Sequence, residues 1–148
     1  MKDFLQEDED FELWWLILSM RRAMHKARAR ELSQYGITPE EAAVLFVVQT
    51  VGRRATPAEI SRWLLREPHS ISGLIQRMEK EGLVKKVKDL DRKNLVRVAL
   101  TEKGQQAYYQ SAKRDSIHQI MSSISKEERQ CIRASLDRLG IRRLRRLG

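Results

Sequence analysis

Cysteine is nearly absent from this sequence, which contains only Cys131 among 148 residues. One cysteine excludes an intrachain disulfide framework and a cysteine-rich zinc site. The three histidines lie far apart and share no spacing typical of metal ligands. There is also no glycine-rich phosphate-binding loop and no set of nucleophile, base and orienting residue. The sequence therefore predicts a protein that is not an enzyme and that needs no metal or other cofactor.

Long apolar runs are missing as well. No uninterrupted apolar stretch approaches the roughly 20 residues that a transmembrane helix needs. The N-terminal stretch MKDFLQEDEDFE is acidic, whereas signal and transit peptides carry positive charge. We therefore expect a cytoplasmic protein.

Positive charge, in contrast, is plentiful. The chain has 29 Lys and Arg residues against 20 Asp and Glu, so its formal net charge is +9. An excess of this size favours a polyanionic partner, which is either nucleic acid or an anionic membrane surface. Composition alone does not distinguish the two.

Helix start and stop signals divide the first half of the chain. Periodic apolar residues beginning at Phe11 predict a helix that runs to about Ser33. Thr38 and Thr56 are each followed by Pro and, three positions on, by Glu. This pattern predicts two N-caps, because Thr accepts a hydrogen bond from the first turn and Pro suits the first helical position. Gly52 is expected to end the first of these helices.

Another helix follows closely, over about residues 68 to 81, and Gly82 is expected to end it. After Gly82 the period changes to two. This change predicts strands over 84–88 and 95–100, joined by the charged turn DLDRKN. The apolar residues of the helix share one face, which we expect to be buried: Ile71, Leu74, Ile75 and Met78.

The last third of the sequence predicts two further helices. Thr101 begins one that is expected to continue to about Ser122. Ser125 begins the other, with Glu128 as its capping-box partner, and Gly140 interrupts it. The predicted fold is therefore mainly α with a small β-hairpin, and the order of elements is that of a winged helix-turn-helix.

This order favours binding to double-stranded DNA, because a major groove admits one α-helix and a basic hairpin can reach the backbone or minor groove. On the helix over 68–81, small polar residues allow close approach to bases, while Gln76 and Arg77 are long enough to hydrogen-bond them. A solvated amphipathic face is the alternative, but the adjoining hairpin and the net charge favour DNA. The residues of the outward face are His69, Ser70, Ser72, Gly73, Gln76, Arg77 and Lys80.

The hairpin supplies further candidates for DNA contact. Arg92 and Lys93 lie at its predicted tip and are expected to reach the minor groove or phosphates, unless the turn is merely solvated. Thr56 is first a capping residue, and its place at a helix N-terminus makes it a second candidate for phosphate contact. The remaining basic residues are expected to contact phosphates rather than bases: Lys85, Lys86, Lys88 and Arg97.

Four segments of the chain resemble the MarR (multiple antibiotic resistance regulator) family of winged-helix transcription regulators. These segments are ITPEEAAVL, TPAEISRWL, SISGLIQRMEKEGLVKK and DRKNLVRVALTEKG. They span residues 37–104, and the last segment is the most specific. The hairpin is one residue longer than the family pattern between Asp91 and Leu100. Either Arg92 or Lys93 therefore takes the place of the wing-tip arginine, and the resemblance implies that Asp91 orients a neighbouring basic side chain.

The resemblance implies a homodimer. Residues 1–35 and 105–148 would supply dimerisation helices, and 36–104 would form the DNA-binding lobe. A twofold dimer would present two recognition helices about 34 Å apart on a pseudo-palindromic operator, usually as a repressor. The flanking regions also hold more apolar residues than one thin helical layer needs: Trp14, Trp15, Leu18, Ile117, Ile120, Ile124, Ile132, Leu136 and Leu139.

Two further properties of the family carry over as expectations. Many members bind a small aromatic or lipophilic effector between the dimerisation helices and the lobe. Here the candidates are Trp14, Trp15, Met24, His25 and Arg28, although core or dimer packing equally explains the tryptophans and Met24. Some members sense oxidants through a cysteine, which makes Cys131 an alternative sensor, and a buried apolar role competes with it. A third alternative is a winged-helix module that docks an acidic protein.

Overall fold

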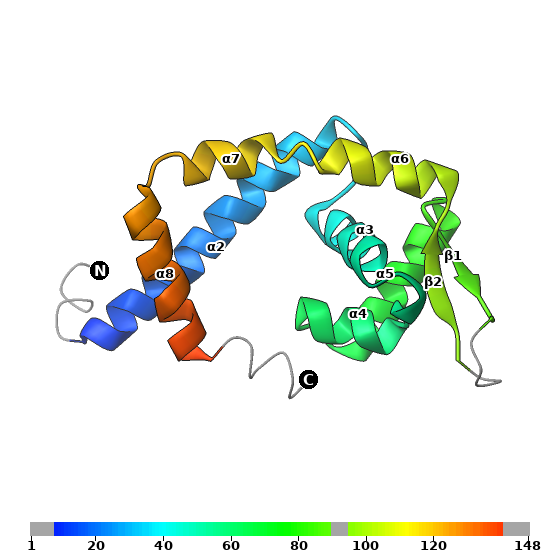
Figure 1. Cartoon of the computed structure of the whole chain (residues 1–148), viewed down its shortest axis with the longest axis horizontal. Coiled ribbons are helices and arrows are strands. Elements are labelled where there is room, and N and C mark those ends of the chain that lie inside the picture. Colours follow the sequence, from blue (N-terminus) through cyan, green and yellow to red (C-terminus); the bar gives the residue numbers. More distant parts are fainter. Residues whose placement is uncertain (1–7, 90–94, 141–148) are drawn as a thin grey trace.

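The computed structural model describes residues 8–89 and 95–140. Figure 1 shows two parts, a lobe formed by α3 to α6 with the hairpin and an arm formed by α2, α7 and α8. None of the described helices has the length and apolar character that a membrane span requires. The elements are α2 (Glu9–Ser33), α3 (Pro39–Val51), the 3₁₀ helix η1 (Gly52–Arg54), α4 (Pro57–Leu64), α5 (Pro68–Lys80), β1 (Val84–Val87), β2 (Arg97–Leu100), α6 (Glu102–Ser111), α7 (Asp115–Met121) and α8 (Lys126–Leu139).

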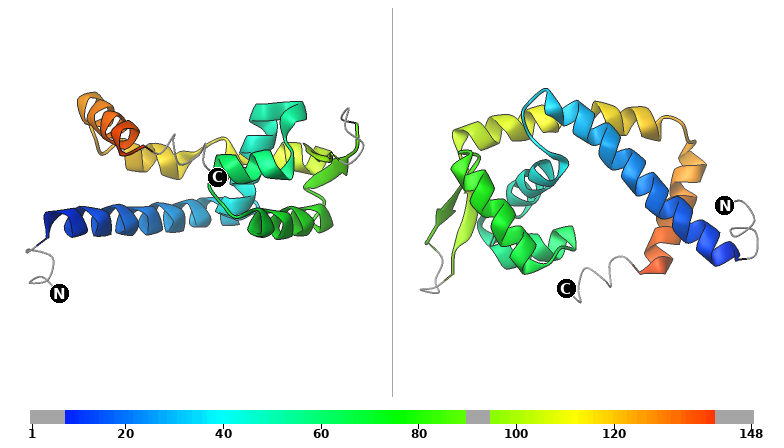
Figure 2. Two further views of the ribbon diagram at one scale, coloured as in Figure 1. Left: turned by 90° about the horizontal axis from the view of Figure 1, so that it is seen from below. Right: turned by 180° about the vertical axis from the view of Figure 1, so that it is seen from behind.

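Helix α2 joins the arm to the lobe. Asp8 caps its start, at the end far from the lobe, and the 25-residue helix runs from there toward the lobe, as both views in Figure 2 show. Leu32, near its C-terminus, is buried in the core of the lobe. Its N-terminal half has no such cover, and every residue from Phe11 to Met20 is exposed.

The capping signals in the sequence are confirmed. At the start of α3, Thr38 accepts a hydrogen bond from the backbone N of Glu41, and the Glu41 carboxylate accepts one from the backbone N of Thr38. Ser125 and Glu128 form the same reciprocal pair before α8. Thr56 caps α4, but the Glu59 carboxylate accepts hydrogen bonds from Arg62 and Trp63 instead of closing a capping box.

The core of the lobe lies between α3, α5 and the hairpin. The predicted inward face of α5 is confirmed, since all four of its apolar residues are buried. They pack with residues of α3 and of the two strands, and such burial of aliphatic side chains supplies the main favourable term in folding. The largest fully buried side chains include Leu32, Val44, Leu45, Val47, Ile60, Ile71, Ile75, Met78, Val84 and Val98.

The hairpin is short and anchored. β1 and β2 are antiparallel, with Val84 opposite Leu100 and Val87 opposite Arg97, so each strand is shorter than the sequence predicted. The backbone N of Val98 also donates to the carbonyl of Ala55 over 2.8 Å, which ties β2 to the segment before α4. The wing is therefore fixed to the rest of the lobe.

The prediction of one continuous helix from Thr101 to about Ser122 is wrong. The chain forms α6 and α7 with a break between Ser111 and Asp115, where Arg114 adopts a left-handed conformation with φ of 56°. Glu31 of α2 accepts hydrogen bonds from the backbone N of Asp115 and from Ser116 Oγ. The bond from Asp115 satisfies a backbone donor that a new helix start leaves free, so a side chain of α2 stabilises the break.

Candidate nucleic-acid interface and adjoining cavity

The outward face of α5 is the centre of the candidate interface. His69, Ser72, Gln76, Arg77 and Lys80 are exposed, as predicted for residues that contact DNA, and Ser70 is half-buried. At the exposed Gly73, a Cβ would meet no described atom within 4 Å, so the helix surface is open there. The face is thus polar, basic at its C-terminal end and free for an approaching ligand.

A tight turn sets the angle between α4 and α5. Leu65 adopts a left-handed conformation with φ of 51°, and Ser61 Oγ donates to the carbonyl of Arg66 over 2.5 Å. Arg66 then donates from Nη2 to Ser70 Oγ over 2.8 Å. The sequence did not reveal Arg66 as a candidate, because its contact with Ser70 depends on this turn.

The hairpin presents a fixed basic side chain. Arg97 donates from Nε to Asp89 Oδ1 over 2.6 Å and from Nη2 to Asp89 Oδ2 over 2.8 Å, and Arg53 Nη2 lies 3.8 Å from the same carboxylate. The hydrogen bonds from Arg97 lower the pKa of Asp89, so the carboxylate is charged at neutral pH. Asp89 therefore holds basic residues of η1 and β2 together.

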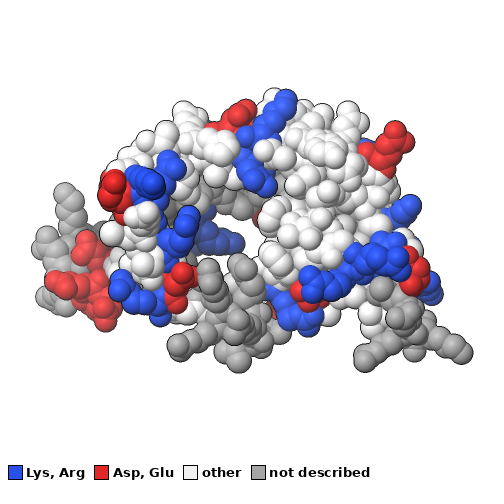
Figure 3. All heavy atoms as spheres, viewed as in Figure 1, with Lys and Arg blue, Asp and Glu red and all other residues white. Residues whose placement is uncertain are grey.

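Sequence reasoning missed Asp89 and assigned an orienting role to Asp91 instead. Asp91, Arg92 and Lys93 lie outside the described residues. Lys85, Lys86 and Lys88 are exposed on and beside β1, and Thr56 is half-buried and occupied in capping α4. Figure 3 shows Lys and Arg side chains gathered along the edge of the lobe formed by α4 and the end of the hairpin.

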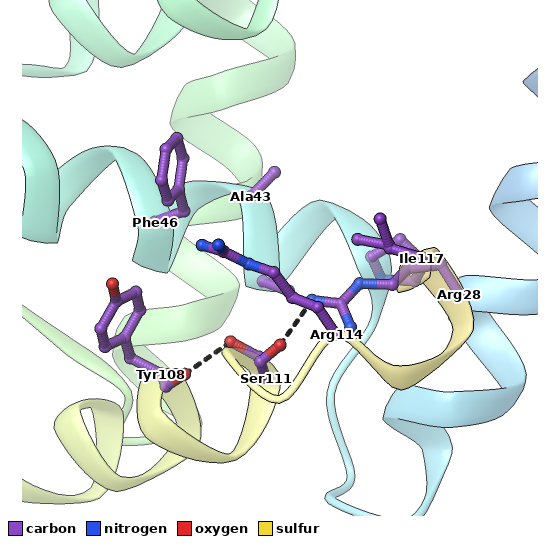
Figure 4. A pocket seen from close by; sticks show the side chains of 9 residues that line it. Arg28, Ala43, Phe46, Tyr108, Ser111, Arg114 and Ile117 are labelled. Atoms are coloured by element: carbon purple, nitrogen blue, oxygen red, sulfur yellow. Dashed lines mark hydrogen bonds between the residues drawn. The ribbon is translucent and has the colours of Figure 1, made fainter. Parts of the chain in front are cut away.

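A cavity of about 360 Å³ lies where the lobe meets the arm. Arg28 of α2 enters it from one side and Arg114 from another, and the Arg114 guanidinium lies 5.7 Å from the centre of the Phe46 ring (Figure 4). The described residues that line it include two guanidinium groups and no carboxylate: Arg28, Pro39, Ala42, Ala43, Phe46, Tyr108, Ser111, Arg114 and Ile117.

Of the five residues predicted to bind an effector, only Arg28 lines this cavity. Trp14 and Trp15 are exposed on the outer half of α2, and Met24 is half-buried. His25 contacts Glu40 at the start of α3, with Nε2 and Oε1 2.6 Å apart. Sequence reasoning missed Phe46, Tyr108 and Arg114, which approach one another only through the packing of α6 on α3.

The other candidates from the sequence lie in the arm. Cys131 is exposed on α8. The described residues contain no group of three or more His, Cys, Asp or Glu side chains placed to hold a metal ion. The helices α2 and α8 carry large exposed apolar side chains: Phe11, Leu13, Trp14, Trp15, Leu16, Ile17, Leu18, Met20, Ile132, Leu136 and Leu139.

Comparisons with known proteins agree with this arrangement. The sequence profile of the MarR family matches residues 35–93. The structure is similar to that of the organohalide-sensing transcriptional regulator RdhR with 2,4-dichlorophenol bound, at 34% identity and a TM-score of 0.83 over 93% of this chain and 82% of that one. The chain belongs to the MarR family. The sequence motifs had indicated this family of DNA-binding transcription regulators, and the comparisons confirm it.

More distant members of the MarR family share the fold. A mutant MarR from E. coli in complex with operator DNA superposes with a TM-score of 0.82 at 20% identity, over 89% of this chain and 96% of that one. The S. aureus MepR–DNA complex gives 0.75 at 22% identity, over 84% and 93%. A search of curated proteins finds no significant match. The winged helix-turn-helix with flanking helices is thus the fold of this chain.

Proposed function

We propose that this MarR-family protein is a homodimeric repressor that binds a pseudo-palindromic operator and is released by a small aromatic effector. The observation that carries the proposal is the open polar face of α5, next to a hairpin whose Arg97 is held by Asp89. A helix of this kind can enter the major groove while the hairpin follows the backbone or minor groove. The MarR and MepR structures with DNA support the same use of this fold.

The arm supports the homodimer. Trp14 is 62% exposed and Leu139 66%, and both belong to the series of large apolar side chains that α2 and α8 expose. Exposed apolar surface of this extent typically marks a protein–protein interface. This apolar surface lies on α2 and α8, which both belong to the arm. A second copy of the chain can bury the exposed apolar side chains of both helices around a twofold axis. We therefore assign Trp14 and Trp15 to the interface between protomers rather than to an effector site.

The two recognition helices would then be held at a fixed separation. A site with half-sites one DNA turn apart, about 34 Å, matches such a dimer. Bases would be read by Gln76, Arg77 and the small residues near the start of α5, and phosphates by Lys86, Lys88 and Arg97. Arg92 and Lys93 keep their predicted role at the wing tip.

The cavity at the junction of lobe and arm is the proposed effector site. Phe46 and Tyr108 offer aromatic surface, and Arg28 and Arg114 offer positive charge. Such a lining suits a planar aromatic molecule with an acidic group. RdhR, which was solved with 2,4-dichlorophenol bound, supports a ligand of this class.

The experiment is a fluorescence-anisotropy titration of labelled duplex from upstream of the protein's own gene, with a scrambled duplex as control. The proposed function predicts preference for the upstream duplex, affinity that falls steeply with salt through counterion release, and release by 2,4-dichlorophenol. Light scattering on the same sample should give the mass of two chains. Equal affinity for both duplexes at every salt concentration would contradict sequence-specific binding and favour the alternative of a protein-interaction module.

A further inference from the structure

Arg28 and Glu31 lie one turn apart on α2 and form a partly buried ion pair. Arg28 Nη1 is 2.6 Å from Glu31 Oε1, and their side chains are 16% and 8% exposed. Burial raises the pKa of Glu31, but hydrogen bonds from Ser116 and Arg28 outweigh it, and the pKa is lowered overall. The pair is therefore charged at neutral pH and is poorly screened by solvent.

This pair contacts the chain on both sides of the break between α6 and α7. Arg28 Nη2 donates to the carbonyl of Ser111, the last residue of α6, over 2.8 Å. Glu31 accepts from the backbone N of Asp115 over 2.5 Å and from Ser116 Oγ over 2.7 Å, both in the first turn of α7. The two side chains thus hold the end of one helix and the start of the next.

The break is also where the lobe meets the arm. α6 packs against α3 in the lobe, whereas α7 packs against α2 in the arm, as Figure 1 shows. A change in the backbone between Ser111 and Asp115 would therefore change the angle between the two parts. In a dimer joined through its arms, that angle sets the separation of the two α5 helices.

Arg28 belongs both to this pair and to the cavity. Its guanidinium lines the cavity beside Arg114, while Glu31 is not among the lining residues. An anion that enters the cavity draws on the same guanidinium, whose five N–H donors lie in one plane and already serve Glu31 and the Ser111 carbonyl.

We infer that the Arg28–Glu31 pair is a clasp across the junction of α6 and α7, and that an anionic aromatic ligand in the cavity opens it by taking Arg28. This inference rests on the proposed function of the cavity as an effector site. A ligand that frees the carbonyl of Ser111 loosens the end of α6, while Glu31 still caps α7. The ligand can lower DNA affinity only to the extent that it binds the open clasp better than the closed one.

The test compares the full-length wild type with Glu31→Gln, using benzoate and its neutral analogue benzamide at matched ionic strength. Gln keeps one acceptor oxygen for the backbone N of Asp115, and its NH2 group can donate to Ser116 Oγ, because a hydroxyl accepts as well as donates. The amide does not compete for Arg28 as a carboxylate does. We expect Glu31→Gln to bind benzoate about fivefold or more tightly than the wild type, and benzamide with unchanged affinity. The matched control is Glu102→Gln, since Glu102 is exposed at the other end of α6.

The same variants report on DNA. We expect Glu31→Gln to bind the upstream duplex several-fold more weakly without ligand, and benzoate to change that affinity less than in the wild type, because the clasp is already open. If Glu31→Gln does not fold, Arg28→Lys serves instead, since Lys keeps the charge but cannot bond Glu31 and Ser111 together in the same plane. That variant should weaken both benzoate and DNA binding.

Three results would overturn the clasp. The first is equal benzoate affinity in the wild type and Glu31→Gln. The second is a gain in benzamide affinity in Glu31→Gln that equals the gain in benzoate affinity, and the third is no benzoate binding to either protein. Benzoate affinity is measured without DNA, so failure of the clasp is distinct from failure of the proposed function. The latter would show as absence of duplex preference in the wild type.

Discussion

Asp89 receives two hydrogen bonds from Arg97 at the turn end of the hairpin and lies within 4 Å of Arg53. Arg53 and Asp89 are exposed and Arg97 is half-buried, so we assign the contact an orienting role rather than a share of folding stability. The carboxylate fixes the plane of the Arg97 guanidinium, and a fixed guanidinium loses less side-chain entropy when it meets a phosphate.

Asp89→Asn should therefore reduce discrimination between duplexes. Removing one negative charge strengthens non-specific attraction to DNA, while release of Arg97 removes a positioned contact. We expect the ratio of affinities for the upstream and scrambled duplexes to fall several-fold in anisotropy titrations. Asp89→Glu keeps the charge and should recover part of that ratio, whereas an unchanged ratio in Asp89→Asn would contradict the orienting role.

Gln76 and Lys86 should differ in how their loss affects binding. Gln76→Ala is expected to cost about 1–3 kcal/mol on the preferred duplex and to relax the choice of base at one position in each half-site. Lys86→Ala should weaken binding to all sequences alike and lower the salt slope by about 1. Affinities over a panel of single-base variants of the upstream duplex measure both effects. If Gln76→Ala and Lys86→Ala gave the same profile over the panel, α5 would not be the reading element.

Substitution by Ala should change the free energy of unfolding in opposite directions at Gly104 and at Gly73. A Cβ at Gly104 would lie 1.9 Å from the carbonyl oxygen of Leu83, so Gly104→Ala must displace the backbone and should cost about 1–3 kcal/mol. Gly73→Ala meets no described atom within 4 Å and lies inside α5, so it should stabilise the fold by about 1 kcal/mol. Denaturant unfolding of both variants gives the two free energies, which should differ in sign.

The raised pKa of Glu81 should make the stability of the fold depend on pH. The carboxyl group of Glu41, whose side chain is buried, favours the protonated form of Glu81 by hydrogen bonding and raises the pKa of Glu81 above its ordinary value of 4.5. Because a carboxylate cannot donate, that hydrogen bond forms only when one of the two groups carries a proton. The resulting stability is fully present below the ordinary pKa and is lost as pH rises through the raised pKa.

Glu81→Gln should remove this dependence, since an amide donates to Glu41 at every pH. We expect the variant to have a higher Tm than the wild type at neutral pH and a smaller change in Tm between acidic and neutral pH. Glu79→Gln, at an exposed position of α5, is the control and should leave the wild-type profile intact. A Glu81→Gln profile parallel to that of the wild type would exclude the shared proton.

Trp14→Glu should dissociate the proposed dimer. The side chain is exposed in one protomer, so the fold of that protomer should tolerate the change, whereas burying a carboxylate in an apolar interface is costly. We expect sedimentation to show single chains at concentrations where the wild type is dimeric, with unchanged helix content by circular dichroism. Tyr109→Glu is a suitable control, because Tyr109 is equally exposed but lies on α6 in the lobe.

Local chemistry was enough to predict much of this fold. The N-caps at Thr38 and Ser125 and the buried face of α5 depend on residues within one or two turns of each other, so their spacing alone identifies them. The outward face of α5 followed directly from the inward one. The change to a period of two after Gly82 then placed the hairpin after it.

The break between α6 and α7 could not be predicted in the same way. It depends on Glu31, which is 84 residues away in sequence from Asp115, and no local signal marks that contact. The cavity residues share this difficulty, since Phe46 and Arg114 meet only after α6 packs on α3. Asp89 was missed for a different reason: the turn segment DLDRKN holds two aspartates close together, and the sequence does not say which of them meets Arg97.

The hydrogen bond from Val98 to Ala55 has a consequence for how the lobe meets a duplex. A hairpin whose strands form hydrogen bonds only with each other can tilt relative to the rest of the lobe and fit grooves of different width. Here that bond ties the middle of β2 to the end of the 3₁₀ segment, so tilting β2 also strains the chain just before α4. The lobe should therefore keep α5 and the hairpin in a fixed relative position. We expect it to bind weakly to duplexes whose minor groove is too wide or too narrow for the hairpin, even where every base that α5 contacts is correct.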